Sequence, residues 1–202
     1  MDMMNAVIFD WGGVIIDDPR NELVKECATY LEVSPEAFAQ AYAKVDTGLM
    51  LGRLPIEGAW YLVCQSLSIE GVRSKKPYLG EAFAKVYQEK QETLDLIAEL
   101  RRAQHKIGLL SNTEMYAIQN FDQRRYTMFD AAIFSCVEGI AKPNEAIYRI
   151  ALDRLHVAPS NAYFIDNHLP HVEAAQKIGI HGIHFISPEQ VRQELSDLLQ
   201  PQ

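Results

Sequence analysis

Five short apolar runs along the chain predict buried β-strands. These runs are residues 6–9, 106–110, 131–134, 162–165 and 180–185. The runs contain little polar alternation, which is typical of strands that are covered on both faces of a sheet. Apolar residues at helical spacing fill the intervals between the last four runs. Strands that alternate with helices in this way indicate a parallel sheet with right-handed crossovers.

The segment between the first and second strands has a different pattern. Residues 19 to about 90 contain no further strand-like run, and their apolar positions predict four helices near residues 23–31, 34–45, 56–67 and 77–86. Ser34 and Pro35 supply a cap and a proline at the first helical position. Gly48, Gly52 and Pro55 are expected to interrupt helix formation. We therefore predict a doubly wound, Rossmann-like α/β sheet from residues 1–16 and 91–202, with a helical insert at 17–90.

Composition limits the classes of partner that we expect. The 202 residues are 48% hydrophobic, enough for one sizeable core. A net charge of −8 with no cluster of lysine and arginine argues against a nucleic-acid partner and favours a small ligand. The three cysteines are widely spaced, so we expect a reducing cytoplasm rather than a disulfide framework. No basic leader or long apolar run predicts a signal peptide or a membrane span, and nothing indicates a protein partner.

Polar residues follow the predicted strands at the points where those strands end. Asp10 follows the first strand, Ser111 and Asn112 follow the second, and Asp166 follows the fourth. The carboxyl ends of parallel strands meet at one edge of a sheet, where ligands bind. Lys142 enters from the loop after the third strand. We therefore expect these side chains to gather in one site.

This set of groups suits phosphoryl transfer. An aspartate can accept a phosphoryl group covalently, and carboxylates with a phosphate oxygen are the ligands that Mg²⁺ prefers. A lysine, a hydroxyl and amides stabilise charge on the phosphate oxygens. Each residue alone also has a simpler interpretation: a turn at Asp10 or Asp166, a helix cap at Ser111, a surface position for Lys142. Their combination favours the chemical interpretation.

Four stretches of sequence resemble the ordered motifs of the haloacid dehalogenase-like hydrolase superfamily. They are residues 9–14, 110–113, 142–143 and 164–167. The resemblance is nearest to the α-D-glucose-1-phosphate phosphatase-like branch with an α-helical cap, and residues 17–90 fall where that cap is inserted. It implies a sheet whose first strand lies between the fourth and the second. It also implies Mg²⁺ and an aspartyl-phosphate intermediate.

The resemblance also implies a role for each matching position. Asp10 would be the nucleophile. The metal would be held by Asp10, the Gly12 carbonyl and Asp166. The phosphate would be held by Ser111, the Asn112 amide and Lys142, and Lys142 would also pair with the nucleophile.

Two positions depart from the family pattern. Gly12 stands where most phosphatases of the superfamily have an aspartate that protonates the leaving group, and Asn167 stands where many relatives have another aspartate. A positioned acid/base contributes about 10²- to 10⁴-fold to a rate. Three interpretations stay open: a phosphatase, a haloacid dehalogenase-type hydrolase, or a non-catalytic ligand-binding module on the same fold. A phosphatase would draw its proton from Asp17, Asp18, His168 or water, or act on an ester whose leaving oxygen needs little help.

We favour a Mg²⁺-dependent phosphatase that hydrolyses a small phosphorylated metabolite, with a sugar phosphate as one candidate. The histidines near Asp166 are given lesser roles. His168 and His171 could share a helix face and bind a metal, but we expect His168 at the pocket mouth and His171 as a partly exposed helix residue. Arg20 and Arg53 are candidates for recognising polar groups of the substrate, although a surface salt bridge is the more common use of such residues.

Overall fold

The computed structural model of the protein describes residues 5–124 and 126–199. Its centre is a parallel sheet of five strands in the order β3-β2-β1-β4-β5, which confirms the predicted fold class and the central place of the first strand. The strands are β1 (Ala6–Phe9), β2 (Lys106–Ser111), β3 (Ala131–Phe134), β4 (Ala162–Asp166) and β5 (His181–His184). The fifth strand is shorter at both ends than the sequence predicted.

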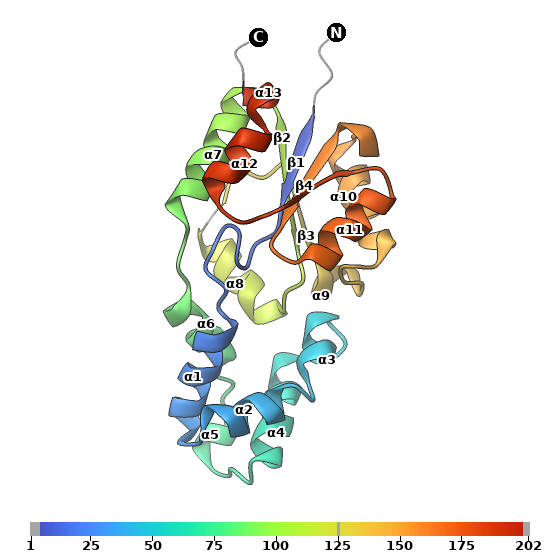
Figure 1. The fold of residues 1–202 in the computed structure, drawn as a ribbon. Coiled ribbons are helices and arrows are strands. Elements are labelled where there is room, and N and C mark those ends of the chain that lie inside the picture. The colour runs from blue at the N-terminus through green and yellow to red at the C-terminus, as the bar shows by residue number, and fades with distance from the viewer. Residues whose placement is uncertain (1–4, 125, 200–202) are drawn as a thin grey trace.

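Helices cover both faces of the sheet (Figure 1). On one face α7 (Gln91–Arg102) packs on β2, with α12 (Pro188–Glu194) and α13 (Ser196–Leu199) against it. On the other face lie α10 (Glu145–Leu155) and α11 (Leu169–Lys177). Successive side chains of a strand point to opposite faces, so Val7 and Phe9 join one apolar cluster while Ala6 and Ile8 join the other. The strand that delivers Asp10 is therefore buried on both sides.

A helical lobe lies beyond the carboxyl edge of the sheet (Figure 1). It consists of α1 (Arg20–Leu31), α2 (Pro35–Tyr42), α3 (Asp46–Met50), α4 (Ile56–Ser66), α5 (Val72–Lys75) and α6 (Leu79–Val86). Phe38 and Trp60 are fully buried in it, whereas Tyr61 is 57% exposed. The two connections to the sheet run side by side, because Ile16 forms an antiparallel bridge with Glu89.

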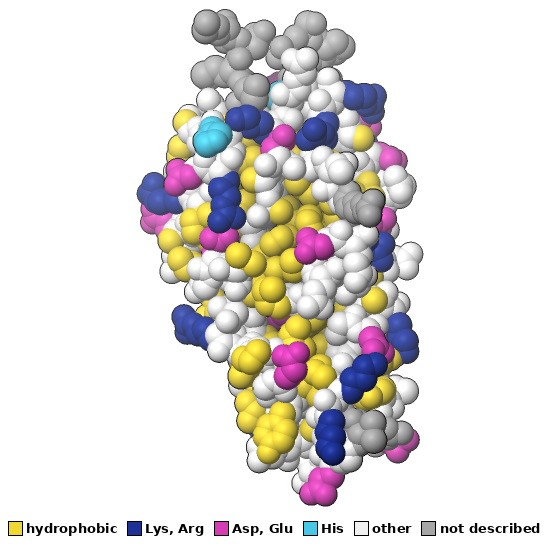
Figure 2. All heavy atoms as spheres, turned by 180° about the vertical axis from the view of Figure 1, so that it is seen from behind, with side chains coloured by type: hydrophobic (Ala, Val, Ile, Leu, Met, Phe, Trp, Pro, Cys, Tyr) yellow, Lys and Arg dark blue, Asp and Glu magenta, His cyan; other side chains and the backbone are white. Residues whose placement is uncertain are grey.

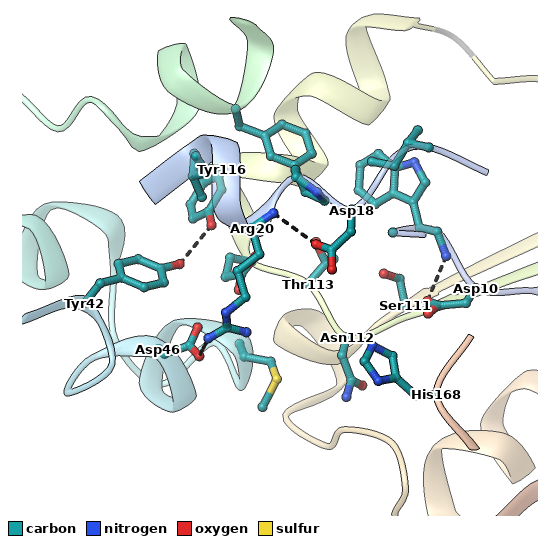
Figure 3. A pocket seen from close by; sticks show the side chains of 18 of the residues that line it. Asp10, Asp18, Arg20, Tyr42, Asp46, Ser111, Asn112, Thr113, Tyr116 and His168 are labelled. Atoms are coloured by element: carbon teal, nitrogen blue, oxygen red, sulfur yellow. Dashed lines mark hydrogen bonds and ion pairs between the residues drawn. The ribbon is translucent and has the colours of Figure 1, made fainter. Parts of the chain in front are cut away.

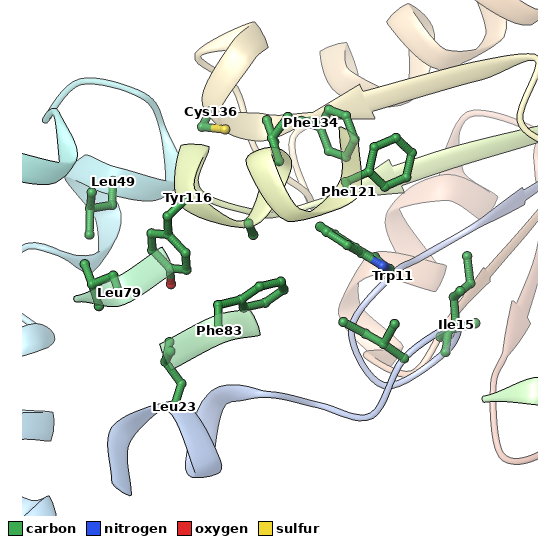
Figure 4. Packing of buried hydrophobic residues seen from close by; sticks show 14 of the residues in the cluster. Trp11, Ile15, Leu23, Leu49, Leu79, Phe83, Tyr116, Phe121, Phe134 and Cys136 are labelled. Atoms are coloured by element: carbon green, nitrogen blue, oxygen red, sulfur yellow. The ribbon is translucent and has the colours of Figure 1, made fainter. Parts of the chain in front are cut away.

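The apolar core continues from the lobe into the sheet domain (Figure 4). Trp11, directly after Asp10, meets Phe83 of α6 with 5.8 Å between ring centroids. It also meets Phe121 of α8 (Met115–Arg124) at 5.5 Å, edge to face. Edge-to-face contacts stabilise aromatic pairs by about 0.5–1.5 kcal/mol beyond their burial. Trp11 therefore ties the turn after β1 to both parts of the molecule.

The helices differ from the prediction in two places. A short helix, α3, forms across Gly48, where we expected an interruption, and it ends before Gly52, whose φ is +64°. The chain then folds back, and the Leu54 amide donates to the Gly48 carbonyl at 3.0 Å. Lys142 and Pro143 precede α10, because Asn144 caps this helix by accepting a hydrogen bond from the Ala146 amide. Two further short helices, α5 and α9 (Ser135–Glu138), have lengths at which periodicity gives no signal.

The cysteines are buried, and charges of both signs lie on the surface (Figure 2). Cys27, Cys64 and Cys136 are buried and carry free thiols. Basic and acidic side chains are interspersed on the face drawn in Figure 2. None of the helices within residues 5–124 and 126–199 combines the length and the apolar character needed to cross a membrane.

Candidate active site

Asp10 lies at the carboxyl edge of the sheet, one residue past β1. Its amide donates to the Ile165 carbonyl of β4 at 2.8 Å, and its Oδ1 accepts from the Trp11 amide at 2.7 Å. The turn that follows needs glycine at position 13. Gly13 has a φ of +83°, and a Cβ there would lie 2.4 Å from Nδ2 of Asn167. The close approach of the β1 and β4 loops thus fixes where the Asp10 carboxylate lies.

Lys142 joins the two strand-end carboxylates. Its Nζ lies 2.8 Å from Asp10 Oδ1 and 2.7 Å from Asp166 Oδ2, and it also donates to the Leu110 carbonyl at 2.9 Å. The Lys142 side chain is fully buried. These three contacts use the three donors of an ammonium group. The orientation of Lys142 is therefore fixed by three different strands.

Asn112 holds the backbone of Lys142 in place. Its Nδ2 donates to the Lys142 carbonyl at 2.9 Å, and its Oδ1 accepts from the Lys142 amide at 2.8 Å. The reciprocal pair links the loop after β2 to the loop after β3. The Asn112 side chain is thus engaged in positioning Lys142, so a phosphate contact from this residue would have to come from its backbone amide.

The two carboxyl groups have opposite pKa shifts. Burial raises the pKa of Asp10, and the Asp166 charge adds to this, against the lowering effect of Lys142. Burial would also raise the pKa of Asp166, but hydrogen bonds from His171 and Lys142 and the Lys142 charge outweigh it and bring this pKa to about 2. When both carboxylates are ionised, the single Lys142 ammonium neutralises only one of their two negative charges.

His171 is the residue that sequence reasoning missed. Its Nδ1 lies 3.0 Å from Asp166 Oδ2, and the other carboxylate oxygen of Asp166 accepts from the His168 amide at 2.7 Å. The His171 side chain is 16% exposed, so it is a partly exposed helix residue as expected, but its contact with Asp166 was not predicted. The usable signal was its place in the first turn of α11, which points back toward the end of β4.

The donor set fits a divalent cation. One donor atom from each of Asp10, Asp166 and His171 lies within 4.8 Å of the others. Asn167 directly follows Asp166 in the sequence. Its Oδ1 is buried and accepts no hydrogen bond from the described residues. Two carboxylates and an amide oxygen are hard ligands of the kind Mg²⁺ takes. The negative charge that Lys142 leaves uncompensated also favours a bound cation.

A cavity of about 340 Å³ opens from Asp10 toward the helical lobe (Figure 3). Ser111, at the end of β2, lines it beside Asp10, together with Asn112 and Gly12. The structure thus brings together Asp10, Gly12, Ser111 and Asn112 around the cavity, with Lys142 and Asp166 buried behind Asp10. What each does chemically is taken up below.

The acid/base candidates are placed differently. Asp18 and His168 line the cavity. Asp17 is not among the described lining residues; its side chain is 61% exposed and lies 3.9 Å from Lys90 Nζ. Gly12 offers no side chain. Of the acid/base candidates predicted from the sequence, Asp18 and His168 are thus the two side chains that line the cavity.

The far end of the cavity is polar and is shared between the lobe and the sheet domain. Arg20 Nη2 pairs with Asp46 Oδ2 at 2.5 Å, and the hydroxyls of Tyr42 and Tyr116 lie 2.9 Å apart (Figure 3). Glu114 lies in the same wall. Burial, followed by the charge of Asp46, raises the pKa of Glu114 to about 7.

Sequence comparison identifies relatives among hydrolases. A family model of haloacid dehalogenase-like hydrolases matches residues 4–179. The Phosphorylated carbohydrates phosphatase of Thermotoga maritima is 25% identical over 192 residues, which cover 91% of this chain and 85% of that protein. Acyl-CoA dehydrogenase family member 10 of Mus musculus is 25% identical over an alignment that covers 96% of this chain. The chain spans only 19% of that mouse protein.

Solved structures share the fold. A HAD family enzyme from Bacteroides thetaiotaomicron has a TM-score of 0.79 at 18% identity, with 95% of this chain and 98% of that chain covered. The same enzyme was also crystallised in complex with magnesium and inorganic phosphate, with a TM-score of 0.71 over 88% of this chain and 92% of that chain. At these identities the likeness concerns the arrangement of the chain.

Proposed function

Because the chain belongs to the haloacid dehalogenase-like hydrolase family, we propose that it is a magnesium-dependent phosphatase that uses Asp10 as its nucleophile. Its class is phosphoric monoester hydrolase, in line with its phosphatase-named relatives. The substrate would be a small phosphorylated metabolite, with a phosphorylated sugar as one candidate. One observation carries this proposal: Lys142 bridges the buried carboxylates of Asp10 and Asp166 at the carboxyl ends of two central strands, beside a cavity.

The reaction would proceed in two steps. In the first, a carboxylate oxygen of Asp10 attacks phosphorus, and the bond from phosphorus to the leaving oxygen breaks. That oxygen departs with the electron pair and takes up a proton. In the second step, water attacks the aspartyl-phosphate, phosphate leaves, and the Asp10 carboxylate is restored.

The neighbouring residues would hold the reacting groups in place. Lys142 would orient Asp10 and balance its charge, because its ammonium is fixed by Leu110 and Asp166 as well. The Ser111 hydroxyl and the Asn112 amide would donate to the phosphate oxygens, where charge develops. Preorganised donors of this kind need no rearrangement during the reaction.

Magnesium would be held by Asp10, Asp166 and the Gly12 carbonyl. When bound, it would supply charge stabilisation on the phosphate oxygens. The fit rests on the hard oxygen donors and on the single Lys142 charge between two carboxylates.

Residues 17–90 would act as a cap. The helical lobe supplies Arg20, Tyr42 and Asp46 to the cavity, and its two connections run together at Ile16 and Glu89. Paired connections allow the lobe to move as a unit and exclude water when the substrate is bound. Leaving-group recognition would therefore reside in this segment.

The test is release of phosphate from 4-nitrophenyl phosphate with and without Mg²⁺. We expect Mg²⁺-dependent turnover in the native chain and essentially none in Asp10→Asn, because an amide attacks phosphorus poorly. Glu22→Gln serves as the control, since it removes one exposed carboxylate of α1, which pairs with Lys25 on the same helix. Metal-independent halide release from a 2-haloacid would favour a dehalogenase instead. Binding of phosphate without any turnover would favour a ligand-binding module.

A further inference from the structure

The cavity wall opposite Asp10 carries an excess of acidic groups. We call this wall the distal wall and define it by Asp18, Arg20, Asp46 and Glu114. Arg20 is the only lysine or arginine among the described residues that line the cavity, whereas three carboxyl groups share the distal wall with it.

The one cation of the distal wall is already paired. Arg20 Nη2 lies 2.5 Å from Asp46 Oδ2, and the Arg20 amide donates to Asp18 Oδ1 at 3.0 Å. The exposed fraction of the side chain is 64% for Arg20 and 22% for Asp46, so solvent screens this pair in part. An anionic group of a ligand that approached the guanidinium would meet the Asp46 carboxylate beside it.

Glu114 adds a third carboxyl group to the distal wall. Burial and the Asp46 charge raise the pKa of this carboxyl to about 7. A second negative charge is thus already unfavourable at this position. Tyr42 and Tyr116 add two hydroxyls that can donate or accept, and carboxylates accept from ligand hydroxyls.

We infer that the distal wall selects phosphate esters whose leaving group is uncharged and bears hydroxyls, and that it rejects leaving groups with a carboxylate or a second phosphate. This inference rests on the proposed function and specifies the substrate class of the same site. The transferred phosphate itself is excepted, because it would meet Ser111, the Asn112 amide and the proposed metal at the other end of the cavity. Like charges brought together without solvent disfavour a ligand strongly.

The test compares two esters of matched shape: 4-(hydroxymethyl)phenyl phosphate and 4-carboxyphenyl phosphate. Their phenolic leaving groups are similar, and they differ in one uncharged hydroxyl against one carboxylate. In the native chain with Mg²⁺ we expect kcat/KM to be at least about tenfold higher for the hydroxymethyl ester. This ratio should decrease as NaCl is added, because salt screens the repulsion.

Removing the acidic groups should remove the discrimination. In the double variant Asp46→Asn, Glu114→Gln we expect the ratio to fall about tenfold toward one, through better turnover of the carboxyl ester. Glu22→Gln, an equal change of charge on an exposed part of α1, should leave the ratio unchanged. The measurement on the native chain stands by itself if the double variant does not fold.

Three outcomes would overturn the inference. They are a native preference for the carboxyl ester, a ratio near one, or a native ratio that the folded double variant retains. In each case continued Mg²⁺-dependent hydrolysis of 4-nitrophenyl phosphate would leave the proposed function standing. Failure to hydrolyse any of the three esters would overturn both.

Discussion

Lys142 Nζ and Asp10 Oδ1 lie 2.8 Å apart in a part of the molecule where the lysine side chain has no exposure. The same ammonium contacts Asp166, so one positive charge serves two buried carboxylates. Removing one partner of a buried ion pair leaves an uncompensated charge, which costs about 3–5 kcal/mol.

Lys142→Met should therefore destabilise the protein by about 3–5 kcal/mol in the absence of metal. Added Mg²⁺ should recover more stability in the variant than in the native chain, since a cation would replace the missing charge. Thermal denaturation with and without Mg²⁺ measures both effects. Lys106→Met is the control, because Lys106 Nζ donates to the Leu155 carbonyl. Equal losses in the two variants, both insensitive to Mg²⁺, would contradict the charge argument.

Asp166→Ala should remove Mg²⁺ binding and metal-dependent turnover while the fold survives. Asp166 is fully buried and has the lower pKa of the two carboxyls, at about 2, so it is ionised at neutral pH. Calorimetric titration with Mg²⁺ measures binding, and phosphate release measures turnover. Glu173→Ala removes an exposed carboxylate from α11, the helix that follows Asp166, and should change neither. Full activity of Asp166→Ala at low Mg²⁺ would rule out this ligand.

The role of the lobe can be tested at a glycine that touches the sheet domain. A Cβ at Gly52 would lie 2.0 Å from the Cys136 carbonyl oxygen, next to the 2.7 Å contact between Ser135 Oγ and the Met50 carbonyl. Gly52→Ala should push the lobe away from α9. We expect KM for a bulky phosphate ester to rise by up to about tenfold, which corresponds to about 1.4 kcal/mol.

Gly71→Ala is the matched control for this change. Gly71 also has a positive φ, of +87°, but a Cβ there meets nothing within 4 Å. Both variants place an alanine at a positive φ, and Gly71, with a ψ of −153°, lies in a region that is essentially restricted to glycine. Backbone strain is therefore present in both, and only Gly52→Ala adds a clash with the sheet domain. If Gly52→Ala and Gly71→Ala have the same KM in steady-state kinetics, closure of the lobe does not govern substrate binding.

Glu114 should make stability depend on pH between about 4.5 and 7. Its pKa is raised from 4.5 to about 7 in the folded protein, first by burial and then by Asp46, with Arg20 opposing. The folded chain therefore holds a proton that the unfolded chain loses in this range, so stability falls as pH rises through it. Glu114→Gln should raise stability at pH 8 by on the order of 1–2 kcal/mol, after a discount for partial exposure, and not at pH 4.

Melting temperatures of the native chain and of Glu114→Gln at pH 4 and pH 8 measure this difference. Glu22→Gln, whose carboxylate is exposed, should show no such dependence on pH. A Glu114→Gln variant that loses stability at pH 8 would show that the Glu114 carboxylate is stabilised by a partner rather than destabilised by burial.

The strands and the residues at their ends could be predicted because their signals are local. A buried parallel strand is an unbroken apolar run, and the residue after it is placed at the edge of the sheet by geometry alone. Asp10, Ser111 and Asp166 were found in this way. The approach of Lys142 to both carboxylates depends in addition on a contact between two loops. Asn112, which lies 30 residues before Lys142, accepts a hydrogen bond from the Lys142 backbone amide.

Contacts that depend on how two parts of the chain meet could not be predicted. The pairing of Arg20 with Asp46 and the approach of Glu114 require the lobe to be placed over the sheet, and no periodicity encodes that placement. His171 was missed because a single histidine on an amphipathic helix has the same pattern whether it faces solvent or a carboxylate. The short helix α3 has only five residues, too few for a periodic signal.

Gly12 leads to a prediction about leaving groups. With no side chain to protonate the departing oxygen, charge accumulates there in the transition state, and a positioned acid would contribute about 10²- to 10⁴-fold. Across a series of phosphate esters, log kcat/KM should therefore rise steeply as leaving-group pKa falls. A flat series, with the chemical step shown to limit the rate, would mean that Asp18 or His168 supplies the proton.

The structure also leaves room to add the missing acid. A Cβ at Gly12 would have its nearest neighbour at 3.7 Å, the Cδ of Pro19, which is an ordinary van der Waals contact. Gly12→Asp should thus fold and should flatten the dependence on leaving-group pKa, with the largest gain for alkyl esters. Gly12→Asn has the same size but no acidic proton, so it should keep the steep dependence. If Gly12→Asp and Gly12→Asn give the same slope, the proton does not come from this position, and the rate is limited by another part of the site.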